Sequence, residues 1–249
     1  ILVEFNGWSI LHIAYAYVTN VLKKKYNANI IAYEGYTLIS SPIKLKFYQK
    51  LKWNLGEFFG FRYFGIYKSF GTKKIIRPII SNAIEIEASK IKEKILLKNL
   101  NKDQFLKLKI KDILIGDLIY DTYLKIYEKE TIYFNDKKFK VLFLESIKIL
   151  IFWIEYFEKN NVKAICLSHT VYTLGIPGRV GNYFGCKVYN PISSNIFKLS
   201  TSNQFAGNSH IHYKKEFKKI NQIEKKRAIK IANQKLKKTL NQLPEKKRF

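Results

Sequence analysis

Sulfur-containing residues are scarce in this sequence, which has no methionine and only two cysteines, Cys166 and Cys186, among 249 residues. Two isolated cysteines exclude a disulfide framework, and their spacing is not that of a zinc site. Such cysteine usage favours the reducing cytoplasm. Because the chain begins without Met and opens directly on a strand-like run, we expect an internal fragment of a longer protein, with no signal-peptide pattern.

Acidic residues and arginine are also scarce. Asp and Glu number 19 against 45 Lys and Arg, which gives a formal net charge of +26, and only five of the basic residues are Arg. Proteins that read nucleic acid prefer Arg, whose planar fork pairs with phosphates and bases. A nucleic-acid partner is therefore the less favoured interpretation. A solvated lysine surface, phosphate-bearing substrates and an anionic membrane surface stay open as alternatives.

The sequence lacks the roughly 20 uninterrupted apolar residues that a membrane-spanning helix needs. Its most apolar stretch, residues 141–157, is interrupted by Glu145, Lys148 and Glu155. The 47% apolar content is nevertheless ample for a core. We predict a folded cytoplasmic protein, with peripheral contact at the inner face of the cytoplasmic membrane as an option.

The N-terminal segment predicts a β-turn-α-β start. Ile1–Phe5 and Asn29–Tyr33 are strand-like, and between them apolar residues recur at helical spacing after a Ser9 N-cap. The G-x-G-x-x-G fingerprint is missing, which argues against a tightly held dinucleotide. Backbone amides at this helix start could meet an anionic or hydroxyl group, or Asn6 and Ser9 only cap the turn. The candidates for substrate binding at this turn are Asn6, Gly7 and Trp8.

A basic and aromatic segment, Ser41–Lys74, follows the second predicted strand and is interpreted as an insertion. One helical face is approximated by Leu45, Tyr48, Leu51, Leu55 and Phe58. Interleaved basic and aromatic residues can bind single-stranded nucleic acid or a membrane interface. The alternative is an amphipathic helix whose aromatic residues belong to the core.

The middle of the chain predicts helices over Ser81–Leu100 and Lys137–Lys159 and an extended segment over Leu106–Ile113. Asp117 and Asp121 are four residues apart and share a face of a helix. They could supply a general base or bind hydroxyl-rich ligands. The alternative is that Asp117 caps its helix and Asp121 lies in the favourable first turn.

Residues 161–191 predict a β-α-β unit at the centre of the protein. Val162–Leu167 is a short apolar run typical of a buried parallel strand. A helix with Gly and Pro at its start follows and ends at Gly185, before a strand from Lys187. Open α/β sheets bind ligands outside the carboxyl ends of their strands. The polar residues there are Ser168, His169, Thr170 and Tyr172.

His169 is the main candidate for chemistry at this turn. Its imidazole could act as a base or donate to a phosphate or sugar oxygen, or it could be a turn histidine satisfied by backbone. Arg179, just inside the next helix, could hold an anion. The G-x-S-x-G pattern of a hydrolase elbow is missing around Ser168. No carboxylate pattern joins the four histidines, so we predict no metal site.

Together these elements predict a Rossmann-like three-layer α/β domain over residues 1–213, with a mainly parallel sheet, helices on both faces and the insertion at 41–74. The chain after Pro191 is interpreted as loop as far as His212. Residues 214–249 form a separate part, with a basic amphipathic helix.

Three motifs carry a resemblance to a known family: Ile-Gly-Asp-Leu-Ile-Tyr-Asp-Thr-Tyr-Leu-Lys at 115–125, Val-Lys-Ala-Ile-Cys-Leu-Ser-His-Thr-Val-Tyr at 162–172, and Gly-Ile-Pro-Gly-Arg-Val-Gly at 175–181. In combination they resemble bacterial surface and capsule polysaccharide biosynthesis proteins, which are glycosyltransferase-like and have two facing Rossmann-like domains (GT-B). The resemblance implies that this chain is the N-terminal, acceptor-side half. The donor nucleotide would then be held mainly by a C-terminal domain, so the fragment alone is expected to be inactive.

The resemblance further implies transfer of a sugar from a nucleotide-activated donor, which is a substrate rather than a resident cofactor, to a surface glycan or a lipid-linked acceptor. His169, Asp117 and Asp121 are the candidates for activating the acceptor hydroxyl. The alternative function is a non-enzymatic lysine-rich module that binds nucleic acid or an anionic membrane surface. The acceptor cleft would be lined by Asn6, Gly7, Trp8, Ser168, Thr170, Tyr172 and Arg179.

Overall fold

The computed structural model describes residues 1–34, 47–192, 195–205 and 213–242. The chain divides into two compact units, residues 1–206 and 207–249.

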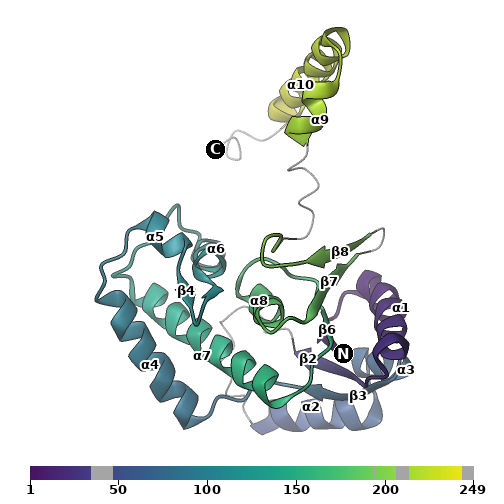
Figure 1. The fold of residues 1–249 in the computed structure, drawn as a ribbon, viewed down its shortest axis with the longest axis vertical. Coiled ribbons are helices and arrows are strands. Elements are labelled where there is room, and N and C mark those ends of the chain that lie inside the picture. Colours follow the sequence, from purple (N-terminus) through teal and green to yellow (C-terminus); the bar gives the residue numbers. More distant parts are fainter. Residues whose placement is uncertain (35–46, 193–194, 206–212, 243–249) are drawn as a thin grey trace. The chain divides into compact units, whose positions relative to one another are not determined.

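A six-stranded sheet organises the first unit, in the order β3-β2-β1-β6-β7-β8 (Figure 1). Its first five strands in this order are mutually parallel, and β8 pairs antiparallel with β7. The chain is therefore an α/β protein with a mostly parallel sheet, compatible with a Rossmann-like domain. The strands are β1 (Leu2–Phe5), β2 (Ile30–Glu34), β3 (Thr72–Ile76), β6 (Ala164–Cys166), β7 (Lys187–Pro191) and β8 (Ile196–Leu199).

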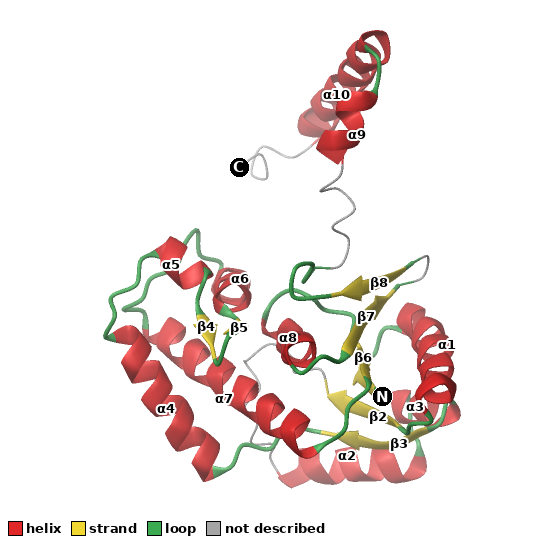
Figure 2. Cartoon of the chain, in the orientation of Figure 1, coloured by secondary structure: helices red, strands yellow, loops and turns green. Residues whose placement is uncertain are grey.

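Alternate residues of the central strands enter two separate cores, because successive side chains of a strand point to opposite faces. Leu2 and Ile165 belong to one hydrophobic cluster, and Val3 and Cys166 belong to the other. Figure 2 shows helices on both sides of the sheet, as the sequence predicts. The second cluster is covered by α1 (Ser9–Tyr26) and α3 (Tyr63–Ser69).

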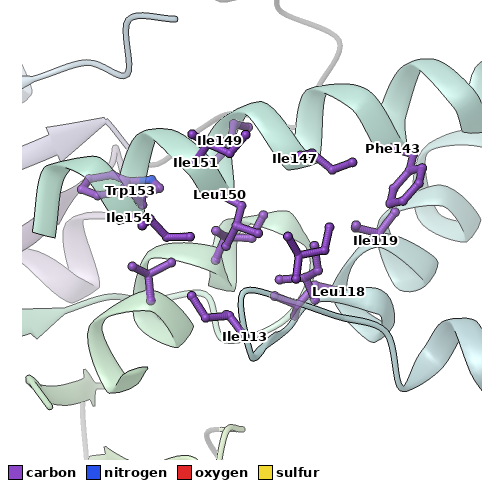
Figure 3. Packing of buried hydrophobic residues seen from close by; sticks show 14 of the residues in the cluster. Ile113, Leu118, Ile119, Phe143, Ile147, Ile149, Leu150, Ile151, Trp153 and Ile154 are labelled. Carbon is purple, nitrogen blue, oxygen red and sulfur yellow. The ribbon is translucent and has the colours of Figure 1, made fainter. Parts of the chain in front are cut away.

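The larger core lies around α7 (Lys137–Lys159), whose bounds are those predicted from the sequence. Asp136 caps its first turn, and Trp153 meets Tyr33 of the sheet edge-on at 5.0 Å (Figure 3 shows the core side of this helix). Burial on this scale stabilises the fold by about 2 kcal/mol for each large apolar side chain. The helices that pack here with α7 are α4 (Asn82–Leu96), α5 (Lys102–Leu106), α6 (Gly116–Tyr127) and α8 (Ile176–Tyr183).

The central β-α-β unit forms as predicted. Strand β6 leads through a single 3₁₀ turn at Thr173–Gly175 into α8, and β7 returns parallel to β6. Gly185 ends the helix with a φ of +75°, in the left-handed region that glycine adopts without strain.

Two predicted segments are wrong in their secondary structure. The region after Pro191 contains β8, a short Ile-Phe-Lys-Leu run within polar surroundings that pairs antiparallel with β7. Leu106–Ile113 is not one extended run: α5 ends at Leu106, and a two-stranded antiparallel hairpin of β4 (Lys109–Ile110) and β5 (Ile113–Leu114) follows.

Two predicted helix caps also need correction. Ser9 is the first residue of α1, and Trp8 occupies the N-cap position without a side-chain bond. Asp117 lies inside the first turn of α6, whose N-cap is Ile115, so it does not cap that helix. Asp121 lies one turn further on, outside the first turn.

The segment Ser41–Lys74 is part of the sheet's own framework rather than an insertion alone. Its described residues form α2 (Phe47–Phe59), α3 and the start of β3, the crossover that leads from β2 to the sheet edge. Residues 41–46, with Leu45 of the predicted helical face, lie outside the described residues.

The second unit consists of α9 (Tyr213–Lys219) and α10 (Gln222–Gln242) within its described residues. Helix α10 agrees with the amphipathic helix predicted within residues 214–249. In the described parts of the chain, no helix combines the length and the apolar character needed to cross a membrane.

Gly116 provides a stability test of this packing. A Cβ at this position would lie 1.7 Å from the backbone oxygen of Phe105, so Gly116→Ala must displace the backbone. We expect a loss of about 2 kcal/mol, as for other overpacked sites, and a Tm lower by about 4–8 °C. Helix propensity alone would make the same change stabilising. Lys125→Ala in the same helix is the control, and an unchanged Tm of Gly116→Ala would contradict this packing.

Candidate functional site

The candidate site lies where the strand order of the sheet reverses. The chain leaves β1 toward β2 on one side and leaves β6 toward β7 on the other, and β1 and β6 are neighbours. Connections that diverge from two adjacent parallel strands leave a crevice at the carboxyl ends, which is where open α/β sheets bind ligands. Glu4, near the end of β1, and Ser168 and His169, just after β6, meet at this point.

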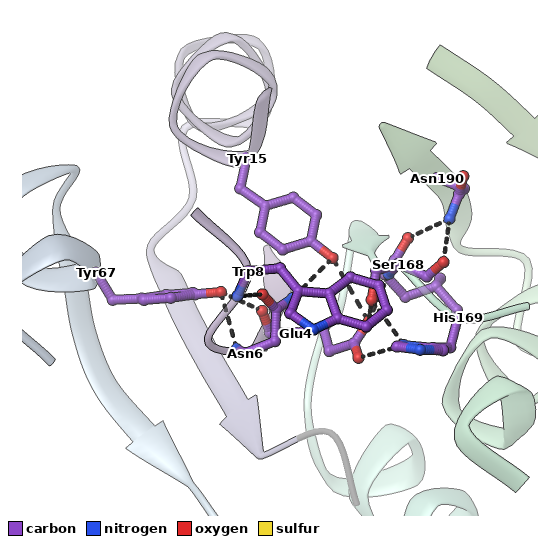
Figure 4. Close-up of polar contacts among 9 residues, drawn as sticks. Glu4, Asn6, Trp8, Tyr15, Tyr67, Ser168, His169 and Asn190 are labelled. Atoms are coloured by element: carbon purple, nitrogen blue, oxygen red, sulfur yellow. Dashed lines mark hydrogen bonds and ion pairs between the residues drawn. The ribbon is translucent and has the colours of Figure 1, made fainter. Parts of the chain in front are cut away.

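The buried Glu4 carboxylate is the centre of the site (Figure 4). One carboxylate oxygen accepts hydrogen bonds from the Ser168 backbone amide and from Ser168 Oγ, the latter at 2.8 Å. The other oxygen lies 3.2 Å from His169 Nδ1, and the Tyr15 hydroxyl donates to the first oxygen from 3.5 Å. Burial, followed by the Glu4 charge, raises the pKa of Tyr15 well above its usual value, so Tyr15 stays a donor.

The hydrogen bonds assign one tautomer to His169. Nδ1 faces Glu4 and lies 2.8 Å from Ser168 Oγ, whose own proton serves Glu4, so Nδ1 carries the ring proton and donates. The lone pair is then on Nε2, and no hydrogen bond to Nε2 occurs among the described residues. The side chain is 22% exposed, so a solute can reach it. A carboxylate that orients an imidazole in this way also stabilises the imidazolium that forms on protonation.

The turn after β1 is held by several hydrogen bonds although it is largely exposed. The Tyr67 hydroxyl donates to the Glu4 carbonyl at 2.6 Å and accepts from the Asn6 amide at 3.1 Å. Asn6 Oδ1 accepts from the Trp8 amide at 3.0 Å, and His12 Nε2 lies 3.0 Å from the Asn6 carbonyl. Asn6 therefore shapes the turn, as the capping alternative predicts.

Trp8 forms an exposed wall beside His169. The tryptophan residue is 55% exposed, and its ring centroid lies 4.9 Å from that of the imidazole. Gly7 has no room for a side chain, since a Cβ would lie 2.9 Å from the Tyr63 ring of α3. Helix α3, which carries Tyr63, thus reaches the edge of the site.

The loop after β6 is fixed from the sheet and from α6. Asn190 of β7 donates from Nδ2 to the carbonyls of Leu167 and Ser168, at 2.8 and 2.7 Å. Thr170 is buried and has an interaction partner. Tyr172 has a φ of +57°, a left-handed value that is costly for a bulky residue. The structure therefore holds the loop in one shape that its sequence does not favour locally.

Asp117 and Arg179 form an ion pair with each other. The guanidinium of Arg179 donates to both carboxylate oxygens of Asp117, at 2.7 and 2.6 Å, and to the Leu114 carbonyl at 2.9 Å. Arg179 is buried. Asp121 lies in the same neighbourhood, where burial first and the Asp117 charge second raise its pKa while Arg179 lowers it. The structure therefore separates the residues predicted for catalysis and anion binding into two groups. His169 is oriented by Glu4, and Asp117 is paired with Arg179.

The predicted helical face of α2 is exposed, so the interpretation of its aromatic residues as core is wrong for most of them. Tyr48, Leu51, Leu55 and Phe58 are all exposed, and Phe58 reaches 77%. Trp53, on the other side of the helix, is half-buried and packs edge-on against Phe5 of β1 at 5.5 Å. Helical periodicity identifies an apolar face but not what covers it.

Glu4 is the residue that sequence reasoning missed. Its partners Ser168 and His169 lie 164 and 165 positions away, so no local spacing announces them. The available signal was a single carboxylate in an otherwise apolar strand, Ile-Leu-Val-Glu-Phe, since a buried carboxylate needs partners.

Among the described residues, no group of three or more His, Cys, Asp and Glu side chains could hold a metal ion. Comparison of the chain with protein-family models, with curated proteins and with solved structures finds no match. The resemblance to polysaccharide biosynthesis proteins therefore stays a prediction, and a functional assignment has to rest on the geometry of the site.

Glu4→Gln tests the role of the buried carboxylate. The amide keeps one acceptor oxygen and turns an NH₂ group toward donors, so a buried donor is left unsatisfied at a cost of about 2 kcal/mol. Urea denaturation should show this loss in the free energy of unfolding. Glu87→Gln, at the half-exposed ion pair with Lys111, is the matched control and should cost less than about 1 kcal/mol. Equal losses in the two variants would contradict a central role for Glu4.

Proposed function

We propose that this chain is the acceptor-side domain of a glycosyltransferase, which uses His169 to activate an acceptor hydroxyl. One observation carries the proposal: a buried carboxylate orients a partly exposed imidazole, with Nε2 as acceptor, beside an exposed tryptophan at the switch point of the sheet. A base in this position needs hydrogen-bond reach to the proton that it removes and a group that stabilises its protonated form. Nε2 and Glu4 meet these two requirements.

In the proposed reaction the acceptor oxygen attacks the anomeric carbon of the donor sugar as its proton passes to Nε2. The bond from the anomeric carbon to the nucleotide phosphate breaks, and the phosphate leaves with the bonding electrons. The imidazolium that results lies next to the Glu4 carboxylate, which stabilises it. A positioned base of this kind contributes about 100-fold or more to the rate.

The exposed side chain of Trp8 is the reason for proposing a sugar as the acceptor. An exposed indole offers an apolar face and a polar N–H on one side chain. The C–H face of a sugar ring can pack on such a surface while one of its hydroxyls reaches Nε2. The fixed Asn6–Trp8 turn holds the indole in place before the substrate arrives, which lowers the entropy cost of binding.

The donor is proposed to be a nucleotide sugar that is bound largely outside this chain. The formal net charge of +26 would draw in its phosphates. The exposed apolar and aromatic face of α2 belongs to a lysine-rich segment and is followed by α3, whose Tyr63 lies against Gly7. This face favours an acceptor carried on a lipid at an anionic membrane surface. The rival function is a lysine-rich module for nucleic acid, whose binding would fall steeply with salt.

Kinetics of the full-length protein test the assignment of the base. With labelled nucleotide sugars and membrane-derived acceptor, His169→Ala should lower kcat by about 100-fold or more and leave KM for acceptor nearly unchanged. Trp8→Ala should instead raise KM for the acceptor, because it removes a binding surface. Asp121→Asn is the comparison variant. A loss of less than about threefold in His169→Ala, with a large loss in Asp121→Asn, would move the base to Asp121.

A further inference from the structure

Helix α10 carries an apolar stripe that is independent of the site around Glu4 and His169. Ile229, Ala232, Leu236 and Leu240 recur every three or four residues and so share one face of the helix. Their large members are open to solvent, Leu236 at 58% and Ile229 at 49%. An isolated water-soluble helix gains nothing from such a stripe, so it calls for a partner.

The charge around the stripe defines what that partner can be. Helix α10 has seven basic residues and one acidic residue, and Lys226 and Lys235 border the stripe on either side. A second copy of the helix would bring lysines against lysines, which is unfavourable. Residues 1–206 are also basic overall, with 31 basic against 16 acidic residues.

Nucleic acid would match the charge but not the stripe. Helix α10 has no aromatic residue on which a base could stack and only one arginine, Arg227. The phosphates of a nucleic acid would pair with the lysines but would leave the leucines of the stripe exposed to water. An anionic lipid surface satisfies both features, since lysines meet the headgroups while the apolar face enters the headgroup–acyl boundary.

We propose that α10 is an interfacial helix that binds anionic lipid with the stripe Ile229, Ala232, Leu236 and Leu240 facing the bilayer. The inference does not rest on the proposed sugar transfer. It requires only the helix, the stripe and the lysines, and it assigns a lipid-binding element to the second unit.

Vesicle flotation of the whole chain tests the proposal. Vesicles of phosphatidylcholine with phosphatidylglycerol should bind the chain, and pure phosphatidylcholine should not. Leu236→Ser with Leu240→Ser should weaken binding at least about tenfold, because two leucines lose their apolar burial. Gln234→Ser with Asn241→Ser, on the opposite face, keeps the same charge and helix length and should bind like the unchanged chain. Equal binding by the two double variants, or equal binding to both vesicle types, would overturn the proposal.

A second measurement covers the case in which the serine variant loses its helix. Burial raises the pKa of Cys166 to about 12 and of Cys186 to about 11, so these buried thiols react poorly with a label. An environment-sensitive fluorophore at Leu236→Cys should shift to the blue on anionic vesicles, and one at Gln234→Cys should not. A shift at both positions or at neither, or a shift at Leu236→Cys with single-stranded RNA in place of vesicles, would contradict the lipid assignment.

Discussion

The buried Glu4 carboxylate is the interaction on which the centre of this protein depends. A charge removed from water is costly unless donors surround it. Glu4 meets the Ser168 amide and hydroxyl, His169 Nδ1 and the Tyr15 hydroxyl, which come from the loop after β6 and from α1. The same residue's carbonyl accepts from Tyr67 of α3. One side chain and its backbone therefore tie together the two strands, the turn after β1 and the helices α1 and α3.

The same hydrogen bonds explain how two loop segments can form a site of defined shape. The Asn6–Trp8 turn and the loop from Ser168 to Tyr172 are held by side chains from Tyr67, Asn190 and Glu4 rather than by regular secondary structure. Such preorganisation is what a base and a binding surface need, because reorganisation at the moment of reaction would cost rate. The proposed removal of a proton from an acceptor hydroxyl depends on this preorganised geometry.

The protein's surface combines an excess of lysine with groups of exposed apolar residues. Lysine excess is spread over both units, yet many of the exposed apolar residues are grouped on α2–α3 and on α10. Large apolar groups on a monomer's surface mark interaction sites when they are contiguous. Their combination with lysine is the basis of the proposed lipid contacts. On α2–α3 this surface borders the candidate site through Tyr63 and Gly7.

Local patterns were enough to predict those elements whose signals lie within the elements themselves. The bounds of α7, the β6–α8–β7 unit and the Gly185 turn follow from apolar periodicity and from the glycine that can end a helix with a positive φ. The mostly parallel sheet follows from the alternation of these strands and helices along the chain. His169 was identified from its place after a buried strand.

Tertiary structure decided everything that depends on distant partners. Strand β8 exists because β7 lies beside it, and the Asp117–Arg179 pair exists because α6 and α8 lie close together in the fold. Glu4 and His169 meet across 165 positions, so neither predicts the other. The sequence by itself determined which residues could be buried, capped or charged, since these are properties of the side chain and its neighbours in the chain. Only folding decided which carboxylate serves which cation or imidazole, because a buried charge takes the partners that the packed strands and helices bring within about 3 Å.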